Sequence, residues 1–178
     1  METKLQRVKK FYDMFTKFWD TEYVDVLFEN LDSRDFFTAP ASTKYHGNYE
    51  GGLFDHSYEV TMCLVELTEK LGLTWEYERS PYVIGMLHDV CKCDQYFKCE
   101  DGYGYRNDLV LPGHGDKSVM IVQQFLTLNE EEVLCIRWHM GAYDDKSVWN
   151  NLGRAIEQYP NVLWTHTADM MASRIKGV

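Results

Sequence analysis

The sequence has no paired cysteine motif, no long apolar run and no excess of basic residues. Its five cysteines are an odd number without a CxxC spacing, which argues against both a disulfide framework and a structural zinc ribbon. We therefore expect reduced, mostly buried thiols. No stretch of about eighteen apolar residues is present to span a membrane, and the polar, basic residues 1–10 are unlike a signal peptide. These absences predict a cytoplasmic protein with no membrane partner.

The shortage of positive charge restricts the class of partner. Acidic residues outnumber basic ones by 28 to 18, which gives a formal net charge of -10. Such a field repels polyanions, so long nucleic acid is not expected to bind. A small anionic substrate remains compatible with the sequence, because a bound metal ion can reverse the sign of the local field.

The length of 178 residues is that of one compact domain, and no internal repeat, low-complexity tract or linker divides it. Hydrophobic residues make up 45% of the chain and aromatic residues 15%, which is ample for a packed core. We therefore expect a single domain over residues 1–178.

Apolar residues recur at steps of three and four along most of the chain, which is the spacing of one helix face. The pattern predicts an N-terminal helical extension over residues 1–32, followed by an irregular connection around His46. One later helix is expected to end at Gly72, another to begin with Ser80 as its cap, and a third to begin with a capping box at Asn129.

An aromatic, turn-rich stretch near residues 94–112 interrupts the helical pattern. It predicts a small β-hairpin with Asp101-Gly102 at its tip, or else an irregular insertion. The fold class expected for the whole chain is all-α, a single compact helical bundle that carries this insertion.

Five of the six histidines stand beside a glycine or an acidic residue, at the edge of a predicted helix or in a loop: His46, His56, His88, His114 and His139. Imidazole and carboxylate together suit Mn, Fe, Co, Ni or Zn, whereas ligands that are all oxygen favour Mg or Ca. The mixed set therefore indicates a transition-metal site.

The adjacent residues His88 and Asp89 belong to a helix that is apolar nearly all round. Burying both without partners is costly, and coordination of a metal satisfies both. The alternative is a helix cap or a hydrogen-bonded pair in the core, which is the commoner explanation of an isolated His-Asp dipeptide.

Five short segments are specific as an ordered set. They are Gly51-Gly52-Leu53-Phe54-Asp55-His56, His88-Asp89-Val90-Cys91-Lys92, Gly113-His114-Gly115-Asp116-Lys117-Ser118, Trp138-His139-Met140-Gly141 and His166-Thr167-Ala168-Asp169. Together they resemble the HD-domain phosphohydrolases, including the HD domain of certain bacterial 3'-to-5' exoribonucleases and related stand-alone hydrolases. The likeness covers residues 44–173, which are expected to form the metal-binding HD core.

The resemblance implies one or two divalent ions, with Mn, Fe, Co, Ni or Zn expected and Mg as a further candidate. The ligands it implies for the first ion are His56, His88, Asp89 and Asp169. It implies that Asp89 bridges to a second ion held by His114 and His139. Relatives that hold two ions often have His-His where this chain has His139-Met140, so the number of ions is left open.

The same resemblance implies hydrolysis of a phosphoester or phosphoanhydride bond of a small nucleotide by metal-activated water. Asp89 would orient the water and Lys92 would hold a phosphate oxygen. His46 is a candidate to contact or protonate the leaving group, and Lys117 is a candidate to bind the anion near a helix start. The alternatives are surface charges for the two lysines and an exposed loop histidine for His46.

Two other functions remain open at this point. One is an exonuclease-type phosphodiesterase that acts on short single-stranded nucleic acid, and the other is a non-catalytic sensor of metal or nucleotide. An ordinary helical bundle with core histidines would require all five segments to align by chance. The sequence does not select the substrate or the native metal, and it leaves a homo-oligomer open.

Overall fold

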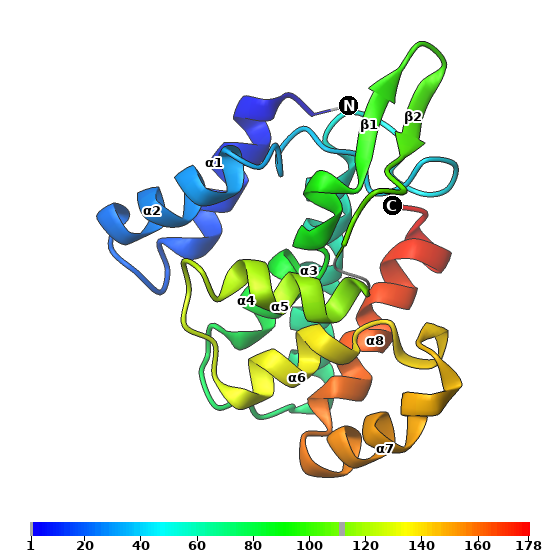
Figure 1. Cartoon of the computed structure of the whole chain (residues 1–178). Coiled ribbons are helices and arrows are strands. Elements are labelled where there is room, and N and C mark those ends of the chain that lie inside the picture. The colour runs from blue at the N-terminus through cyan, green and yellow to red at the C-terminus, as the bar shows by residue number, and fades with distance from the viewer. Residues whose placement is uncertain (1, 111–112) are drawn as a thin grey trace.

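The computed structural model describes residues 2–110 and 113–178, and nearly all regular structure in them is helical (Figure 1). This confirms the expected all-α fold. The α-helices are α1 (Lys4–Phe15), α2 (Thr21–Asp32), α3 (Gly52–Leu71), α4 (Ser80–Leu87), α5 (His114–Val122), α6 (Glu130–Trp138), α7 (Trp149–Gln158) and α8 (Asn161–Met170). Short 3-10 turns form η1 (Val90–Asp94), η2 (Gly141–Tyr143) and η3 (Lys146–Val148), and a π-helical turn, η4 (Met171–Lys176), follows α8.

The centre of the fold is α4, as its all-round apolar sequence predicts. Every residue of this helix except Tyr82 is buried. Helix α4 packs against α3, α6 and α8, and α3 and α6 also pack against α8. Helices α3 and α4 approach each other closely at Gly85, where an added Cβ would lie 2.5 Å from the Cα of Thr61 in α3. The two helices therefore touch backbone to backbone.

The N-terminal helices α1 and α2 lie together on one side of the bundle, coloured blue in Figure 1. Phe11 of α1 stacks on Phe15 and meets the edge of Phe37, which packs in turn on Phe54 of α3. The buried guanidinium of Arg7 donates two hydrogen bonds, of 2.7 and 2.9 Å, to the Asp55 carboxylate. Arg7 thus anchors α1 to the first turn of α3, beside His56.

The predicted helix ends are confirmed in part. Helix α3 ends at Gly72, whose φ of 65° is left-handed, and Asn129 forms the expected capping box with Glu132. The predicted cap at Ser80 is wrong. Ser80 is instead the first residue of α4, and its hydroxyl donates to the buried carboxylate of Glu132 at 3.0 Å.

The expected hairpin is formed by β1 (Tyr96–Cys99) and β2 (Gly102–Tyr105), which pair antiparallel and project from the bundle (Figure 1). Cys99 pairs with Gly102, so the residues at the tip are Glu100 and Asp101, one position before the predicted Asp-Gly pair. Leu111 and Pro112, at the end of the predicted stretch, lie outside the described residues.

Within the described residues, none of the helices combines the length and the apolar character needed to cross a membrane.

We expect Gly85→Ala to lower the free energy of unfolding by about 1–3 kcal/mol, because the added methyl group overlaps the α3 backbone. Gly153→Ala in α7 is the matched control, because an added Cβ there meets nothing within 4 Å. Alanine at that position should stabilise the helix by up to about 1 kcal/mol. Urea unfolding measures both changes, and equal stability of the two variants would contradict the close contact of α3 and α4.

Candidate metal centre

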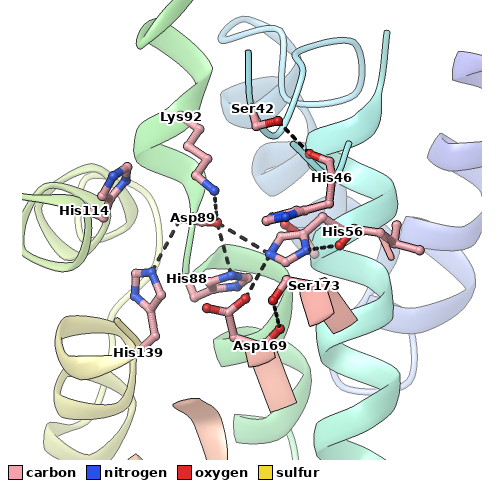
Figure 2. A network of polar contacts seen from close by, with 12 residues as sticks. Ser42, His46, His56, His88, Asp89, Lys92, His114, His139, Asp169 and Ser173 are labelled. Carbon is pink, nitrogen blue, oxygen red and sulfur yellow. Dashed lines mark hydrogen bonds and ion pairs between the residues drawn. The ribbon is translucent and has the colours of Figure 1, made fainter. Parts of the chain in front are cut away.

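Five of the predicted ligands converge where the ends of several helices meet (Figure 2). His56 comes from the start of α3, Asp169 from the end of α8, and His139 directly follows α6. His88 and Asp89 directly follow α4. All except the half-buried Asp169 are buried, so the site is built into the core.

The Asp89 carboxylate is the centre of this cluster. Its Oδ2 lies 2.6 Å from Lys92 Nζ and 3.3 Å from His88 Nε2. Oδ1 lies 3.4 Å from His139 Nε2, on the opposite side from His56 in Figure 2. His56 Nε2 lies 3.6 Å from Asp89 Oδ2 and 3.3 Å from Asp169 Oδ1, which joins the two carboxylates through one imidazole.

The backbone determines which nitrogen of each imidazole carries the proton. The Nδ1 atoms of His56, His88 and His139 lie 2.7–2.9 Å from the backbone oxygens of Val178, Gly85 and Ile136, respectively. A backbone oxygen accepts, so Nδ1 of each ring is the donor and Nε2 of the neutral ring keeps a free lone pair. All three Nε2 lone pairs then face carboxylates.

This arrangement leaves buried polar atoms without partners. Among the described residues, the Nε2 atoms of His56, His88 and His139 and Oδ1 of Asp89 are buried and accept or donate no hydrogen bond. Lone pairs that face one another are repulsive, and burying them is costly. A cation between them removes both penalties.

The spacing of these atoms also fits a metal ion. Ligand bonds of about 2.0–2.1 Å put neighbouring tetrahedral ligands about 3.3–3.4 Å apart, close to the 3.3–3.6 Å found here. Two of the three donor sets that could hold an ion among the described residues lie within this cluster, and all donor atoms of a set lie within 4.8 Å of one another. They are His56 with His88 and Asp169, and His88 with Asp89 and His139.

The charge beside Asp89 favours its ionised form. Burial by itself raises the pKa of Asp89, but the Lys92 amine outweighs it and holds that pKa well below its usual range. Asp89 is therefore anionic at neutral pH and available as a ligand.

The backbone leaves the α-helical conformation at the His88-Asp89 pair. The sequence pattern predicts that His88 and Asp89 both lie within a helix, but α4 ends at Leu87 and that prediction is wrong. Asp89 has φ -110° and ψ 16°, outside the helical region, and η1 starts at the next residue. This change turns the Asp89 carboxylate toward His139 and brings Lys92, three residues on, back to its other oxygen.

The two histidines that were expected to share a second ion belong to different donor sets, and Asp89 is common to both sets. His139 belongs to the cluster around Asp89, whereas the Nδ1 of His114 lies 3.4 Å from the thiol sulfur of Cys91. Figure 2 shows the His114 ring apart from the other imidazoles. Cys91 has no place in the sequence prediction, because a single cysteine between Asp89 and Lys92 carries no motif.

The other predicted residues have different surroundings. The ring of His46 lies 5.1 Å from that of His56, centre to centre, so the loop before α3 does reach the site. Lys117 is buried and its amine is paired with Asp94, so the surface position considered for it is wrong. His166 Nδ1 donates to the carbonyl oxygen of His139 at 2.7 Å and supports that ligand from behind.

A cavity of about 150 Å³ opens beside Asp89. The sequence analysis did not identify several residues that line this cavity, because they lie on turns next to the ligands rather than in the motifs. Ser173 and Arg174 follow Asp169 by one turn, and that spacing was the only signal for them. The lining residues are His46, Asp89, Lys92, Met140, Tyr143, Asp169, Met170, Ser173 and Arg174.

Part of the chain is similar to a characterised archaeal enzyme. Over 67 residues it is 37% identical to the dihydroneopterin 2',3'-cyclic phosphate phosphodiesterase of Methanocaldococcus jannaschii. The match covers 36% of this chain and 27% of that protein. No family model matches the chain, and no solved structure matches it. The chain is therefore a partial homologue of a phosphodiesterase.

The position of His46 makes the stability of the metal-free protein sensitive to acid. Burial, followed by the nearby His56 and Lys92, lowers the pKa of His46 to about 4 from 6.5. Between these two values the unfolded chain binds a proton at this residue that the folded protein does not bind, so stability falls as the pH falls. We expect His46→Gln to lose less stability than the unsubstituted protein between pH 7 and pH 5. Urea unfolding of chelator-treated protein measures this, and equal losses would contradict a partly buried His46 with a lowered pKa.

Proposed function

We propose that the chain is a metal-dependent phosphohydrolase of the HD family that cleaves a phosphoester or phosphoanhydride bond of a small nucleotide. The observation that carries this proposal is the set of three buried imidazole Nε2 atoms that face two carboxylates and have no hydrogen-bond partner among residues 2–110 and 113–178. Hydrogen bonding within the protein does not account for such a set, and a divalent cation does.

The ligands that we assign to the ion are His56, His88, Asp89 and Asp169, with His139 as a further ligand on the far side of Asp89. A divalent ion bound there supplies Lewis acidity to a phosphoryl oxygen and to water. The imidazole nitrogens in the set favour Mn, Fe, Co, Ni or Zn over Mg.

The chain's own residues supply the remaining parts of a hydrolytic site. The Lys92 amine lies 2.6 Å from Asp89 and lines the cavity. From there it can bind a phosphate oxygen while it stays close to the carboxylate. His46 lines the same cavity, and its pKa of about 4 makes it a neutral hydrogen-bond partner near pH 7. This favours contact with the substrate over storage of a proton for the leaving group.

Size and charge support a compact substrate. The cavity is small, about 150 Å³, and the net charge of -10 works against a long polyanion. The archaeal relative is named for a small cyclic phosphate, which supports a small phosphoester here as well. We assign this activity to residues 44–173. Residues 1–32 form a helical extension that is linked to this core by the hydrogen bonds from Arg7 to Asp55.

Metal-stripped protein should regain hydrolysis of one class of substrate when Mn, Co, Ni or Zn is restored. The panel contains nucleoside monophosphates, nucleoside triphosphates, 2',3'-cyclic and 3',5'-cyclic nucleotides and short oligonucleotides, assayed for released phosphate or opened ring. Asp89→Asn keeps the shape of the side chain but removes its charge, so it should abolish turnover. Metal binding without turnover of any substrate would instead support a sensor, and turnover of oligonucleotides alone would support an exonuclease.

Removal of the Lys92 amine should lower the rate of hydrolysis in a protein that still folds. We expect Lys92→Met to lower kcat/KM by about 10²–10³, the usual effect of losing one group that stabilises the transition state. Lys98→Met, on the exposed strand β1, is the matched control and should keep full activity. Steady-state kinetics at a saturating metal concentration measure both. An unchanged kcat/KM for Lys92→Met would show that Lys92 only neutralises Asp89.

A further inference from the structure

Beside the cluster around Asp89, a second group of donors is formed by Asp89, Cys91 and His114. One donor atom of each lies within 4.8 Å of the others. Asp89 and Cys91 are buried and His114 is partly exposed. The shared member is Asp89, whose Oδ1 is buried and has no hydrogen-bond partner among the described residues. In Figure 2, His114 and His139 both lie to the left of Asp89, opposite His56.

We propose that the Cys91 thiolate is a ligand of a second metal ion held by Asp89 and His114. The HD resemblance already implies Asp89 and His114 for such an ion, so the new element is Cys91, and the inference rests on the proposed function through Asp89. A site with three protein ligands and one partly exposed side leaves room for a further, exchangeable ligand.

The distance between Cys91 and His114 is that of two ligands on one ion. Bonds of about 2.3 Å to sulfur and about 2.0 Å to nitrogen put two tetrahedral ligands about 3.5 Å apart. The Sγ of Cys91 lies 3.4 Å from Nδ1 of His114. A neutral thiol is a weak hydrogen-bond partner, so a simple contact between thiol and imidazole gives little reason for this close and buried approach.

Several contacts hold α5 and η1 together around this pair. The hydroxyl of Ser118 accepts a 3.2 Å hydrogen bond from the backbone N–H of Cys91. The buried amine of Lys117 is paired with Asp94, at the far end of η1. An added Cβ at Gly115 would lie 2.0 Å from the carbonyl oxygen of Arg137, so α5 also packs tightly on α6. These three contacts fix the position of His114 against Cys91.

The chemistry of the thiol selects the ion. A coordinated thiol loses its proton to the solvent, because the ion stabilises the thiolate directly. A sulfur ligand favours Zn, Co and Fe(II), and it disfavours Mg and Mn. The second position should therefore discriminate among metals that the first position accepts.

The test is a cobalt titration of metal-stripped protein, followed by near-ultraviolet absorption and by elemental analysis. We expect two equivalents of cobalt to bind, and a charge-transfer band from thiolate to cobalt to accompany one of them. In Cys91→Ser the band should disappear while one equivalent remains. Cys135→Ser is the matched control, because Cys135 is equally buried but lies in α6, and it should keep the band and both equivalents.

The unsubstituted protein decides the question even if a variant folds poorly. Absence of a thiolate band at saturating cobalt would overturn the second position, and so would survival of the band in a folded Cys91→Ser protein. If one equivalent binds without a thiolate band and hydrolysis is restored, only this inference fails. If no cobalt binds at all, the proposed function fails with it.

Discussion

The burial of the Asp89 carboxylate is the constraint on which the rest of this structure depends. A carboxylate removed from water must be matched by positive charge or by a cation. Lys92 matches one of its oxygens at 2.6 Å, whereas the other oxygen faces His139 without a hydrogen bond. The bundle has thus brought an ion pair into its core in which, among the described residues, one carboxylate oxygen has no hydrogen-bond partner. That oxygen and the three unpartnered imidazole nitrogens beside it make the core a candidate metal centre rather than an ordinary ion pair.

The helix ends provide the orientation that such a centre needs. His88 and His139 occupy the same position in their helices, directly after the last residue of α4 and of α6. In each case Nδ1 donates to the carbonyl oxygen three residues earlier, which is one of the carbonyls that a helix end leaves unpaired. One contact therefore satisfies the helix and turns Nε2 inward. His56 obtains the same orientation from the backbone oxygen of Val178, far away in the sequence.

Much of the fold follows from short-range residue patterns that can be recognised in the sequence. Helical spacing predicted the bundle, Gly72 predicted the end of α3, and the pair Asn129 and Glu132 predicted the start of α6. These features depend on neighbours within about four residues, so no tertiary information is needed. The cap at Ser80 failed for the opposite reason, because its hydroxyl donates to Glu132 from another helix. The end of α4 at Leu87 could not be predicted either, since the turn there serves contacts of Asp89 with distant residues.

For the site, the sequence by itself determined which residue types are available and in what order, and it singled out the residues that the structure brings together around Asp89. Only the tertiary structure decided how they are shared. It places His139 on Asp89 but His114 against Cys91, and it gives the Lys117 amine to Asp94. The physical reason is that a donor atom is placed by the packing angle of its helix and by the backbone group behind its ring. Neither is encoded in the spacing of the residues along the chain.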